Sequence, residues 1–299
     1  MVLFIFSVYK KIALGYNEFM YTDAHVHILD TLEEIENNDA AELINCKTGL
    51  LDKEIFFCAS ADVSERFKTQ EKICSADTSS FILSFGIHPQ NPITTEIPFL
   101  EKLIAEKRIK AIGECGFDLF NEAYRKNSSA QKKVWDIQVR FAQKAGLPLI
   151  IHCRKALHLI FADTEKLKKI PAVIFHGWSG SVIEANSFLR KGVNAYFNIG
   201  KGLLRGQRAQ IEACKNMDFS RLLTETDAPY MTLKGEDYSM PADIKAVVKR
   251  AAEIRLGCGS SIQENKNITE EFKLHIFDNF KRAFNLCNTA KSSLDFVRA

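Results

Sequence analysis

The sequence lacks an apolar run long enough to cross a bilayer. The run near its start, in MVLFIFSVYKK, holds about seven apolar residues, whereas a membrane-spanning helix needs about 20. Positive charges follow this run instead of preceding it, and no small-residue cleavage site is present, so we expect no signal peptide. We predict a cytoplasmic protein without membrane association. Because Met20 directly precedes the first strand-like run, we expect residues 1–19 to be an extension outside the fold.

Paired cysteines, a strong net charge and linker sequences are also absent. The eight cysteines are scattered with no CxxC spacing, which favours reduced thiols over a disulfide scaffold. A formal net charge of +3 on 299 residues gives no broad electrostatic footprint for nucleic acid or an anionic membrane, so any anion binding must be local. No Pro, Gly or Ser-rich linker and no internal repeat divides the chain, which leaves a single large domain open.

The sequence has instead a regular alternation of short apolar runs and helical periodicities. Eight apolar runs suit buried parallel strands, and they begin at residues 20, 54, 81, 109, 147, 171, 194 and 221. Helices are expected between them, for example over 128–145, and after the last run over 241–255 and 270–284. In the first of these helices the expected buried face consists of Val134, Ile137, Phe141, Ala142 and Ala145.

This alternation predicts an α/β fold. The eight βα units match a single-domain TIM-type (β/α)8 barrel over residues 20–288, followed by a C-terminal tail at 289–299. An open doubly wound sheet is the alternative, because periodicity defines the units better than the way in which they close.

Polar side chains end five of the eight apolar runs. They are His25, His27, Glu114, His152, His176 and Asp227. In a barrel these strand ends meet on one face, where barrel enzymes build their active sites, so the pattern favours the barrel over the open sheet. An unpaired carboxylate after the apolar run IKAIG would cost several kcal/mol, so Glu114 requires a cation or hydrogen-bond donors nearby.

The HxH pair alone is weak support for a metal site. Alternate residues of a strand point to opposite faces, and both imidazoles reach one ion only if the strand bends into a loop. Taken together, four neutral imidazoles and two carboxylates have a formal charge of −2, so two divalent cations would leave the site at +2. Such a site suits an anionic substrate, above all a phosphate ester, and can bind hydroxide at neutral pH. The imidazoles favour zinc, manganese, iron or cobalt, while the carboxylates keep magnesium open.

Six short segments and a pair of glutamines make the sequence similar to the TatD family of metal-dependent hydrolases. They are DAHVH (23–27), GIHP (86–89), GECGFD (113–118), Gln131 with Gln138, LPLIIHCR (147–154), HGWSG (176–180) and TDAPY (226–230). The resemblance implies a βα barrel that holds two divalent metals and acts as a deoxyribonuclease or a related phosphodiesterase.

The resemblance also assigns roles to the six strand-end residues. It implies that one metal is held by His25, His27, Glu114 and Asp227, and the other by Glu114, His152 and His176. Glu114 would then bridge the two ions, and Asp227 would hold and deprotonate the attacking water. These two carboxylates are the expected catalytic residues.

Other residues are candidates for substrate contact. The resemblance implies that His88 contacts a substrate phosphate. Arg154 could neutralise a phosphate as a bidentate donor or could pair with a surface carboxylate. A basic segment with Lys201, Arg205 and Arg208 follows the seventh run, where barrels often bind phosphate, but a solvated loop is an equal alternative.

The segment 234–243 differs from the family pattern and is acidic. Glu236 and Asp237 near the mouth of the site would repel a long polyanion, which makes a small phosphoester or nucleotide a better substrate than extended DNA.

The expected function is therefore dinuclear metal-dependent hydrolysis of phosphoester bonds, in DNA or in a nucleotide-like substrate, by metal-bound hydroxide. No obligate protein partner is expected. The same ions would also serve a carboxyl-ester or amide hydrolase, such as an aminoacyl-tRNA deacylase. A catalytically weak metal-binding scaffold is the alternative from another class.

Overall fold

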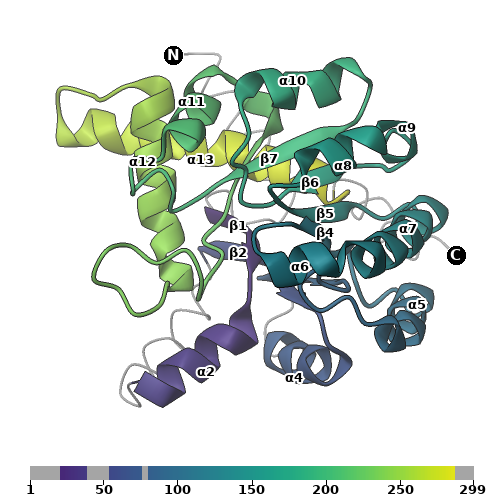
Figure 1. Cartoon of the computed structure of the whole chain (residues 1–299). Coiled ribbons are helices and arrows are strands. Elements are labelled where there is room, and N and C mark those ends of the chain that lie inside the picture. Colours follow the sequence, from purple (N-terminus) through teal and green to yellow (C-terminus); the bar gives the residue numbers. More distant parts are fainter. Residues whose placement is uncertain (1–20, 39–53, 76–79, 287–299) are drawn as a thin grey trace, which may run out of the picture.

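The computed structural model describes residues 21–38, 54–75 and 80–286, which form a barrel of eight parallel strands (Figure 1). The strands pair in chain order from the first to the eighth. They are β1 (Tyr21–Val26), β2 (Ile55–Ala61), β3 (Phe81–Phe85), β4 (Ala111–Asp118), β5 (Leu149–Arg154), β6 (Val173–Phe175), β7 (Ala195–Ile199) and β8 (Leu222–Thr224). Each strand coincides with one of the predicted runs, so the predicted barrel is confirmed and the open sheet is wrong. The extension at 1–19 and the tail at 289–299 lie outside the described residues, and those boundaries stay predictions.

Short contacts between the ends of β1 and β8 bring the barrel close to closure. The backbone N–H of Asp227 donates to the carbonyl of His25 at 3.1 Å, and the N–H of His27 donates to the carbonyl of Ala228 at 2.8 Å. Beside them the fully buried Asp23 carboxylate accepts hydrogen bonds from the backbone N–H of Thr226 at 3.0 Å and from its hydroxyl at 2.5 Å. The HxH pair and Asp227 are therefore fixed to each other through the backbone.

Helices follow the strands and cover the outside of the barrel. They are α2 (Ile28–Asn38), α4 (Ser64–Cys74), α5 (Ile97–Ala105), α6 (Glu122–Lys126), α7 (Ser128–Ala145), α8 (Leu157–Ala162), α9 (Thr164–Leu167), α10 (Val182–Arg190), α11 (Arg208–Asn216), α12 (Ile244–Leu256) and α13 (Ile262–Ala283). Three short 3-10 turns are η3 (Thr94–Glu96), η4 (Phe219–Arg221) and η5 (Pro241–Asp243). Within the described ranges, no helix combines the length and the apolar character that a bilayer crossing would need.

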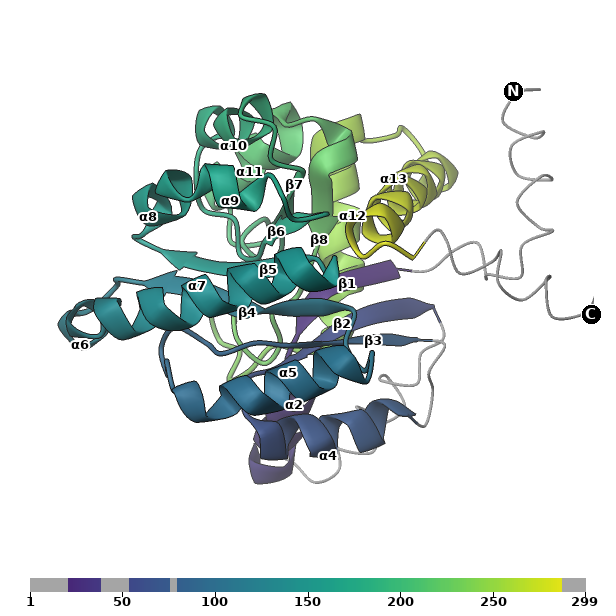
Figure 2. The same ribbon diagram turned by 90° about the vertical axis from the view of Figure 1, so that its right-hand side faces the viewer.

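Helix α13 lies against the end of the barrel at which the strands begin (Figure 2). Its Asn279 amide donates to the carbonyls of Phe219 and Leu222 at 2.7 and 2.8 Å, just before β8. Phe280 and Phe284 join the apolar cluster inside the barrel, to which every strand contributes. The strand residues of this cluster are Ala24, Cys58, Ile82, Ala111, Ile150, Ile174, Tyr196 and Leu223. The beginning of the barrel is thus filled with apolar side chains, which leaves the opposite end for polar residues.

Helix α7 matches the predicted range 128–145, but its buried face differs from the expected one. The helix ends at Gly146, whose φ of 64° is the left-handed conformation that glycine adopts without strain. Ile137 and Phe141 are only half-buried and Ala145 is exposed. The face that packs on the barrel consists of Gln131, Val134, Trp135, Gln138, Val139 and Ala142. The expected face was therefore partly wrong. It contained only apolar residues, whereas the observed face includes Gln131 and Gln138.

The two buried glutamines of α7 hold the backbone where β3 and β4 end. Gln138 accepts a hydrogen bond from the N–H of Ile87 at 2.7 Å and donates to its carbonyl at 3.2 Å. Gln131 does the same for Asp118, with both distances at 3.0 Å. Each amide bonds a backbone N–H and a backbone carbonyl that no neighbouring strand satisfies, so both strand ends are fixed. The two hydrogen bonds of Gln138 fix the backbone of Ile87, which directly precedes His88.

Replacing Gln131 by leucine should lower the free energy of unfolding by about 1–3 kcal/mol, because the buried N–H and carbonyl of Asp118 lose their partner. Denaturant unfolding measures the difference. Gln143→Leu is the matched control on the same helix, since its amide bonds only the carbonyl of Lys166 at the surface. The control should stay within about 0.5 kcal/mol of the wild type. Equal losses in the two variants would contradict the role of Gln131.

Candidate metal centre

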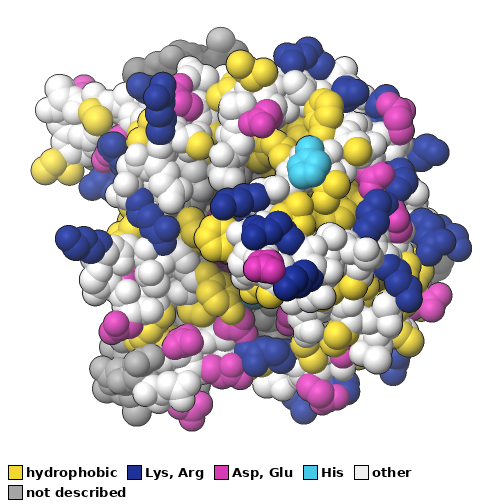
Figure 3. Space-filling model, viewed as in Figure 1, with side chains coloured by type: hydrophobic (Ala, Val, Ile, Leu, Met, Phe, Trp, Pro, Cys, Tyr) yellow, Lys and Arg dark blue, Asp and Glu magenta, His cyan; other side chains and the backbone are white. Residues whose placement is uncertain are grey.

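The strands end around a cavity of about 670 Å³. Its walls include His27, His88, Glu114, His152, His176 and Asp227. The charged side chains on the surface are unevenly distributed (Figure 3). Acidic side chains gather around α2, which carries Asp30 and three glutamates, and basic ones gather around α6, which carries Arg125 and Lys126.

His25 and His27 point to the same side despite their spacing of two residues. The pairing of β1 with β2 shifts register between Asp23 and Val26, and β1 ends at Val26. The two Nε2 atoms lie 3.0 Å apart, with the rings nearly perpendicular at 83°. The chain therefore makes the bend that an HxH pair needs to serve one ion.

A second register shift aims Glu114 into the cavity. It lies in the pairing of β4 with β5, between Ile112 and Cys115. Gly113 has a φ of 142°, and a Cβ added there would lie 2.5 Å from the carbonyl oxygen of Ile150. Only glycine fits this backbone and this close approach. The glycine before Glu114 thus allows a strand residue to leave the ladder and face the site.

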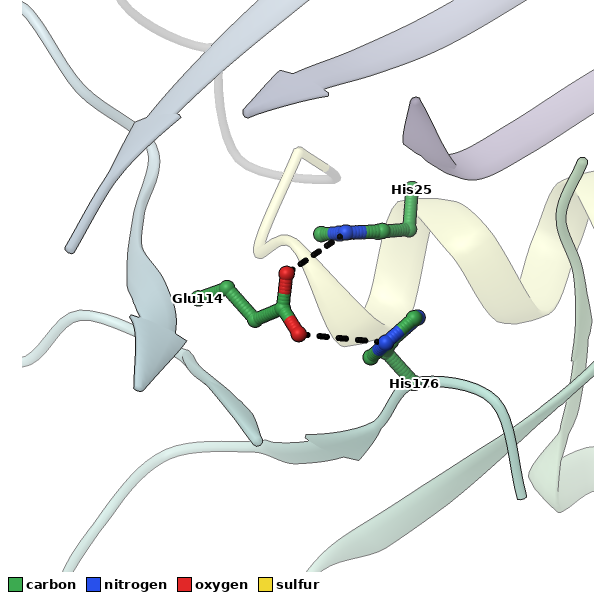
Figure 4. A group of neighbouring side chains, drawn as sticks. All are labelled: His25, Glu114 and His176. Atoms are coloured by element: carbon green, nitrogen blue, oxygen red, sulfur yellow. Dashed lines mark ion pairs between the residues drawn. The ribbon is translucent and has the colours of Figure 1, made fainter. Parts of the chain in front are cut away.

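The two oxygens of Glu114 face different histidines (Figure 4). Oε2 lies 3.1 Å from Nε2 of His25 and 3.7 Å from Nε2 of His27. Oε1 lies 3.1 Å from Nε2 of His176 and is also in contact with Nδ1 of His152. Burial by itself would raise the pKa of Glu114, but the surrounding imidazoles, His176 above all, hold this pKa well below its ordinary value. The carboxylate is therefore ionised and stands between two sets of nitrogen ligands.

The first set fits one divalent ion. Asp227 Oδ1 lies 3.7 Å from Nε2 of both His25 and His27. The two Nε2 atoms lie 3.0 Å apart, and the distances from them to Glu114 Oε2 and Asp227 Oδ1 run from 3.1 to 3.7 Å. Ligand atoms around a tetrahedral ion with bonds of about 2.0–2.2 Å lie roughly 3.4 Å apart, so little movement would be needed. Asp227 adopts a φ of 57°, which Asp and Asn tolerate better than other non-glycine residues.

The second set contains one histidine more than expected. Besides His152 and His176, the Nε2 of His88 lies 3.3 Å from Glu114 Oε1 and 3.3 Å from His152 Nδ1. Glu114, His152 and His88 together place ligand atoms within 4.8 Å of one another, as a bound cation requires. His88 was expected to contact substrate only, and the structure places it among the residues that could hold the second ion.

Three polar side chains that the motifs did not single out orient the histidines. Each contacts the ring nitrogen that faces away from the other ligands, as supporting residues do in metal sites. His25 Nδ1 lies 3.1 Å from Ser60 Oγ, His152 Nε2 lies 3.2 Å from Asp118 Oδ2, and His176 Nδ1 lies 3.4 Å from Glu225 Oε2. Asp118 ends GECGFD and Glu225 stands two residues before Asp227, so position near a ligand was the only available signal. Nothing in the sequence pointed to Ser60.

Asp118 and Glu225 change the charge that was expected for the site. Burial would raise the pKa of both carboxyls, but the hydrogen bond with His152 lowers the pKa of Asp118 to about 2, and His176 lowers that of Glu225. Both are ionised at neutral pH, so four carboxylates surround the ligand set instead of two. Two divalent cations would be balanced by these four carboxylates, whereas the expected formal charge of +2 counted only Glu114 and Asp227.

The basic segment after β7 does not form a phosphate site around Lys201. This side chain is fully buried and donates to Glu236 and Asp243, each at 2.6 Å. Arg205 lines the cavity and Arg208 begins α11 as an exposed residue. The segment 234–243 is thus attached to the barrel by an internal ion pair, and the charge of Glu236, one of its two expected repulsive groups, is already balanced.

Comparison with known proteins identifies the family. The TatD related DNase family matches residues 22–285. The chain belongs to this family. Among curated TatD relatives, the 3'-5' ssDNA/RNA exonuclease TatD of Cronobacter turicensis is 33% identical over 153 residues, covering 49% of this chain and 56% of that protein. That of Pantoea ananatis is 30% identical over 171 residues, covering 54% and 63%. The chain thus spans less than two thirds of the length of these relatives.

Solved structures of TatD proteins share the fold. The TatD homolog YjjV from Escherichia coli has a TM-score of 0.72 at 19% identity, covering 90% of this chain and 99% of that chain. The TatD family hydrolase from Entamoeba histolytica has a TM-score of 0.68 at 16% identity, covering 88% and 97%. At these identities the comparison supports the barrel and not the substrate.

Glu225→Gln should weaken metal binding by roughly 10- to 100-fold, because the amide supports the His176 imidazole less well than a carboxylate does. Calorimetric titration of the metal-free protein with Zn²⁺ or Mn²⁺ measures the change. The exposed Glu212→Gln on α11 is the control and should titrate like the wild type. Unchanged affinity in Glu225→Gln would show that Glu225 does not support the ligand.

Metal affinity should fall at least about fourfold between pH 7.5 and 5.5, because protons compete with cations for Asp227 and for the imidazoles of His152 and His176. Burial alone would lower the pKa of these two imidazoles, but the Glu114 carboxylate raises both. Burial raises the pKa of Asp227 to about 6, so this carboxylate becomes protonated and unable to bind a cation as the pH falls through that value. Burial lowers the pKa of His27 to about 3, so His27 stays neutral and does not contribute. The same titration at each pH provides the measurement, and a pH-independent affinity would contradict the assignment of Asp227 as a ligand.

Proposed function

We propose that this chain hydrolyses phosphodiester bonds of single-stranded DNA or RNA with two divalent metal ions. The observation that carries the proposal is the position of Glu114 between two sets of imidazoles, one facing each carboxylate oxygen. The TatD relatives named as 3'-5' ssDNA/RNA exonucleases support the substrate class. No feature of the site favours a carboxyl-ester substrate or a scaffold without activity.

The ligands of the two ions are proposed as predicted. His25, His27 and Asp227 would hold one ion, His152 and His176 would hold the other, and Glu114 would serve both. His88 stands close enough to ligate the second ion, and its place on the cavity wall also suits contact with a substrate phosphate. The number of imidazoles favours zinc or manganese over magnesium or calcium.

The chain's own carboxylates carry out the proton transfer. Two bound ions would lower the pKa of a water molecule and offset the negative charge that develops on the phosphate. Asp227 lies on the cavity wall beside the first set, so its carboxylate can accept the proton of the attacking water. Glu114 is shielded by the imidazoles and keeps the two sets at a fixed separation.

Chelation should abolish phosphodiester hydrolysis, and adding back Zn²⁺ or Mn²⁺ should restore it, because no other described group replaces the cations. The assay follows bis(p-nitrophenyl) phosphate and a labelled single-stranded oligonucleotide, with elemental analysis of the same preparation. A carboxyl ester and a charged tRNA are assayed in parallel. Full activity in a metal-free preparation, or hydrolysis of the acyl esters alone, would reject the proposed function.

Asp227→Asn should lower kcat on bis(p-nitrophenyl) phosphate by roughly 10²–10⁴-fold at saturating metal, because the amide cannot accept the proton. Asparagine is the suitable replacement, since it also tolerates the positive φ at this position. Asp237→Asn changes an exposed carboxylate of the neighbouring loop and should leave kcat unchanged. Unchanged turnover in Asp227→Asn would refute the role of this residue as the base.

A further inference from the structure

A ring and two cations stand together at the rim of the cavity, on the side of β5. Phe120 comes from the loop after β4, Arg154 ends β5, and Lys155 follows it. The guanidinium carbon of Arg154 lies 4.1 Å from the centroid of the Phe120 ring, and the Lys155 Nζ lies 4.7 Å from it. The ring remains 48% exposed and the Arg154 side chain 47% exposed. We call these three residues the rim stack.

The loop that carries Phe120 is well anchored, so the exposure of the ring does not come from a loose backbone. The N–H of Phe120 donates to Asp118 Oδ1 at 2.8 Å, and the N–H of Leu119 donates to the carbonyl of Arg154 at 2.9 Å. From the other side, Arg125 donates to the carbonyls of Leu119 and Phe120, each at 3.2 Å. The structure fixes the ring at the rim with one part of its surface in solvent.

The two cations of the rim stack are held by the ring more than by carboxylates. Arg154 comes no closer than 3.9 Å to Asp118 Oδ2, which already accepts hydrogen bonds from Gln90 and contacts His152. Over the ranges that the structure describes, Lys155 has no carboxylate within 4 Å. Cations above an aromatic face keep most of their capacity to bind an anion. Both charges are therefore available to a phosphate.

The charged side chains around the cavity differ from one side to the other. On the α2 side, Asp30 and Asp62 line the cavity, and Asp30 is paired with Arg66. Cations lie elsewhere around it: Arg205 lines its wall, and the rim stack lies near the basic side chains around α6 (Figure 3).

We propose that the rim stack binds the nucleotide next to the bond that is cleaved, with its phosphate on Arg154 and Lys155 and its base against Phe120. The proposal rests on the proposed phosphodiesterase function. The Arg154 guanidinium is separated from the metal-facing His152 by a single carboxylate, that of Asp118, which places a phosphate on Arg154 beside the metal centre. Stacking needs an unpaired base, so the preferred substrate is a single strand of two or more nucleotides and not a duplex or a mononucleotide.

The test compares two substrates in the metal-loaded enzyme. One is a single-stranded oligonucleotide of about ten nucleotides. The other is bis(p-nitrophenyl) phosphate, which has a phosphodiester but no base or second phosphate. For Phe120→Ala, the ratio of kcat/KM for the oligonucleotide to that for the small ester should fall about 5- to 100-fold, mostly through KM. Phe120→Tyr keeps an aromatic face and should restore the ratio. Ile183→Ala, which removes an exposed apolar side chain on α10, is the matched control.

The salt dependence of kcat/KM on the oligonucleotide tests the two cations separately. Removing one phosphate contact should reduce the slope of log kcat/KM against log salt by about 0.7. Arg154→Gln and Lys155→Asn should each show this reduction, and asparagine suits the φ of 54° at position 155. Lys68→Gln on α4 is the control and should keep the wild-type slope, because that exposed lysine is paired with Glu65 at 2.6 Å.

The outcomes separate the rim stack from the function on which it rests. An unchanged substrate ratio in Phe120→Ala together with unchanged salt slopes in both cation variants would overturn the rim stack, while hydrolysis of the small ester would leave the proposed function standing. If Phe120→Ala does not fold, the salt slopes of the two cation variants decide. Absence of hydrolysis of either substrate by the metal-loaded wild type would overturn both.

Discussion

The carboxylate of Glu114 is the interaction on which the rest of the site depends. It is buried and stays ionised only because imidazoles from three other strands surround it. The backbone that delivers it is a register shift next to a glycine that no larger residue could replace. The carboxyl ends of β1, β5 and β6 must therefore lie at fixed distances from that point. A nearly closed barrel of parallel strands achieves this, and the apolar filling of the opposite end of the barrel holds it in place.

Around this point the protein uses buried amides and carboxylates as spacers. Gln131 and Gln138 fix the strand ends that carry Asp118 and His88, and Asp23 joins the ends of β1 and β8. A buried polar group is costly unless it is satisfied, so each of these side chains has a defined position. The positions of the ligand side chains are therefore fixed by buried residues that are not ligands themselves. Supports of this kind explain how side chains from five strands can meet in one cavity.

Much of this arrangement could be predicted from the sequence. The six strand-end residues were readable because a His, Glu or Asp ends five of the eight apolar runs, and a barrel brings such ends together. The buried face of α7 could not be read, because glutamine counts as polar until its backbone partner is known. Lys201 looked like a solvent or phosphate contact, since the carboxylates that bury it lie 35 and 42 residues further along the chain. Long-range pairing of this kind leaves no periodicity in the sequence.

The charge balance of the site constrains how a substrate can approach. With Asp118 and Glu225 ionised, a metal centre with two divalent ions would carry little net charge. It would then attract an anionic substrate only weakly. The attraction of a phosphate then depends on the charges at the rim of the cavity. Two cations lie over Phe120 at the end of β5, and carboxylates lie beside α2. On the α2 side the charge of Asp30 is paired with Arg66, so the cations over Phe120 are rim charges that remain available to a phosphate.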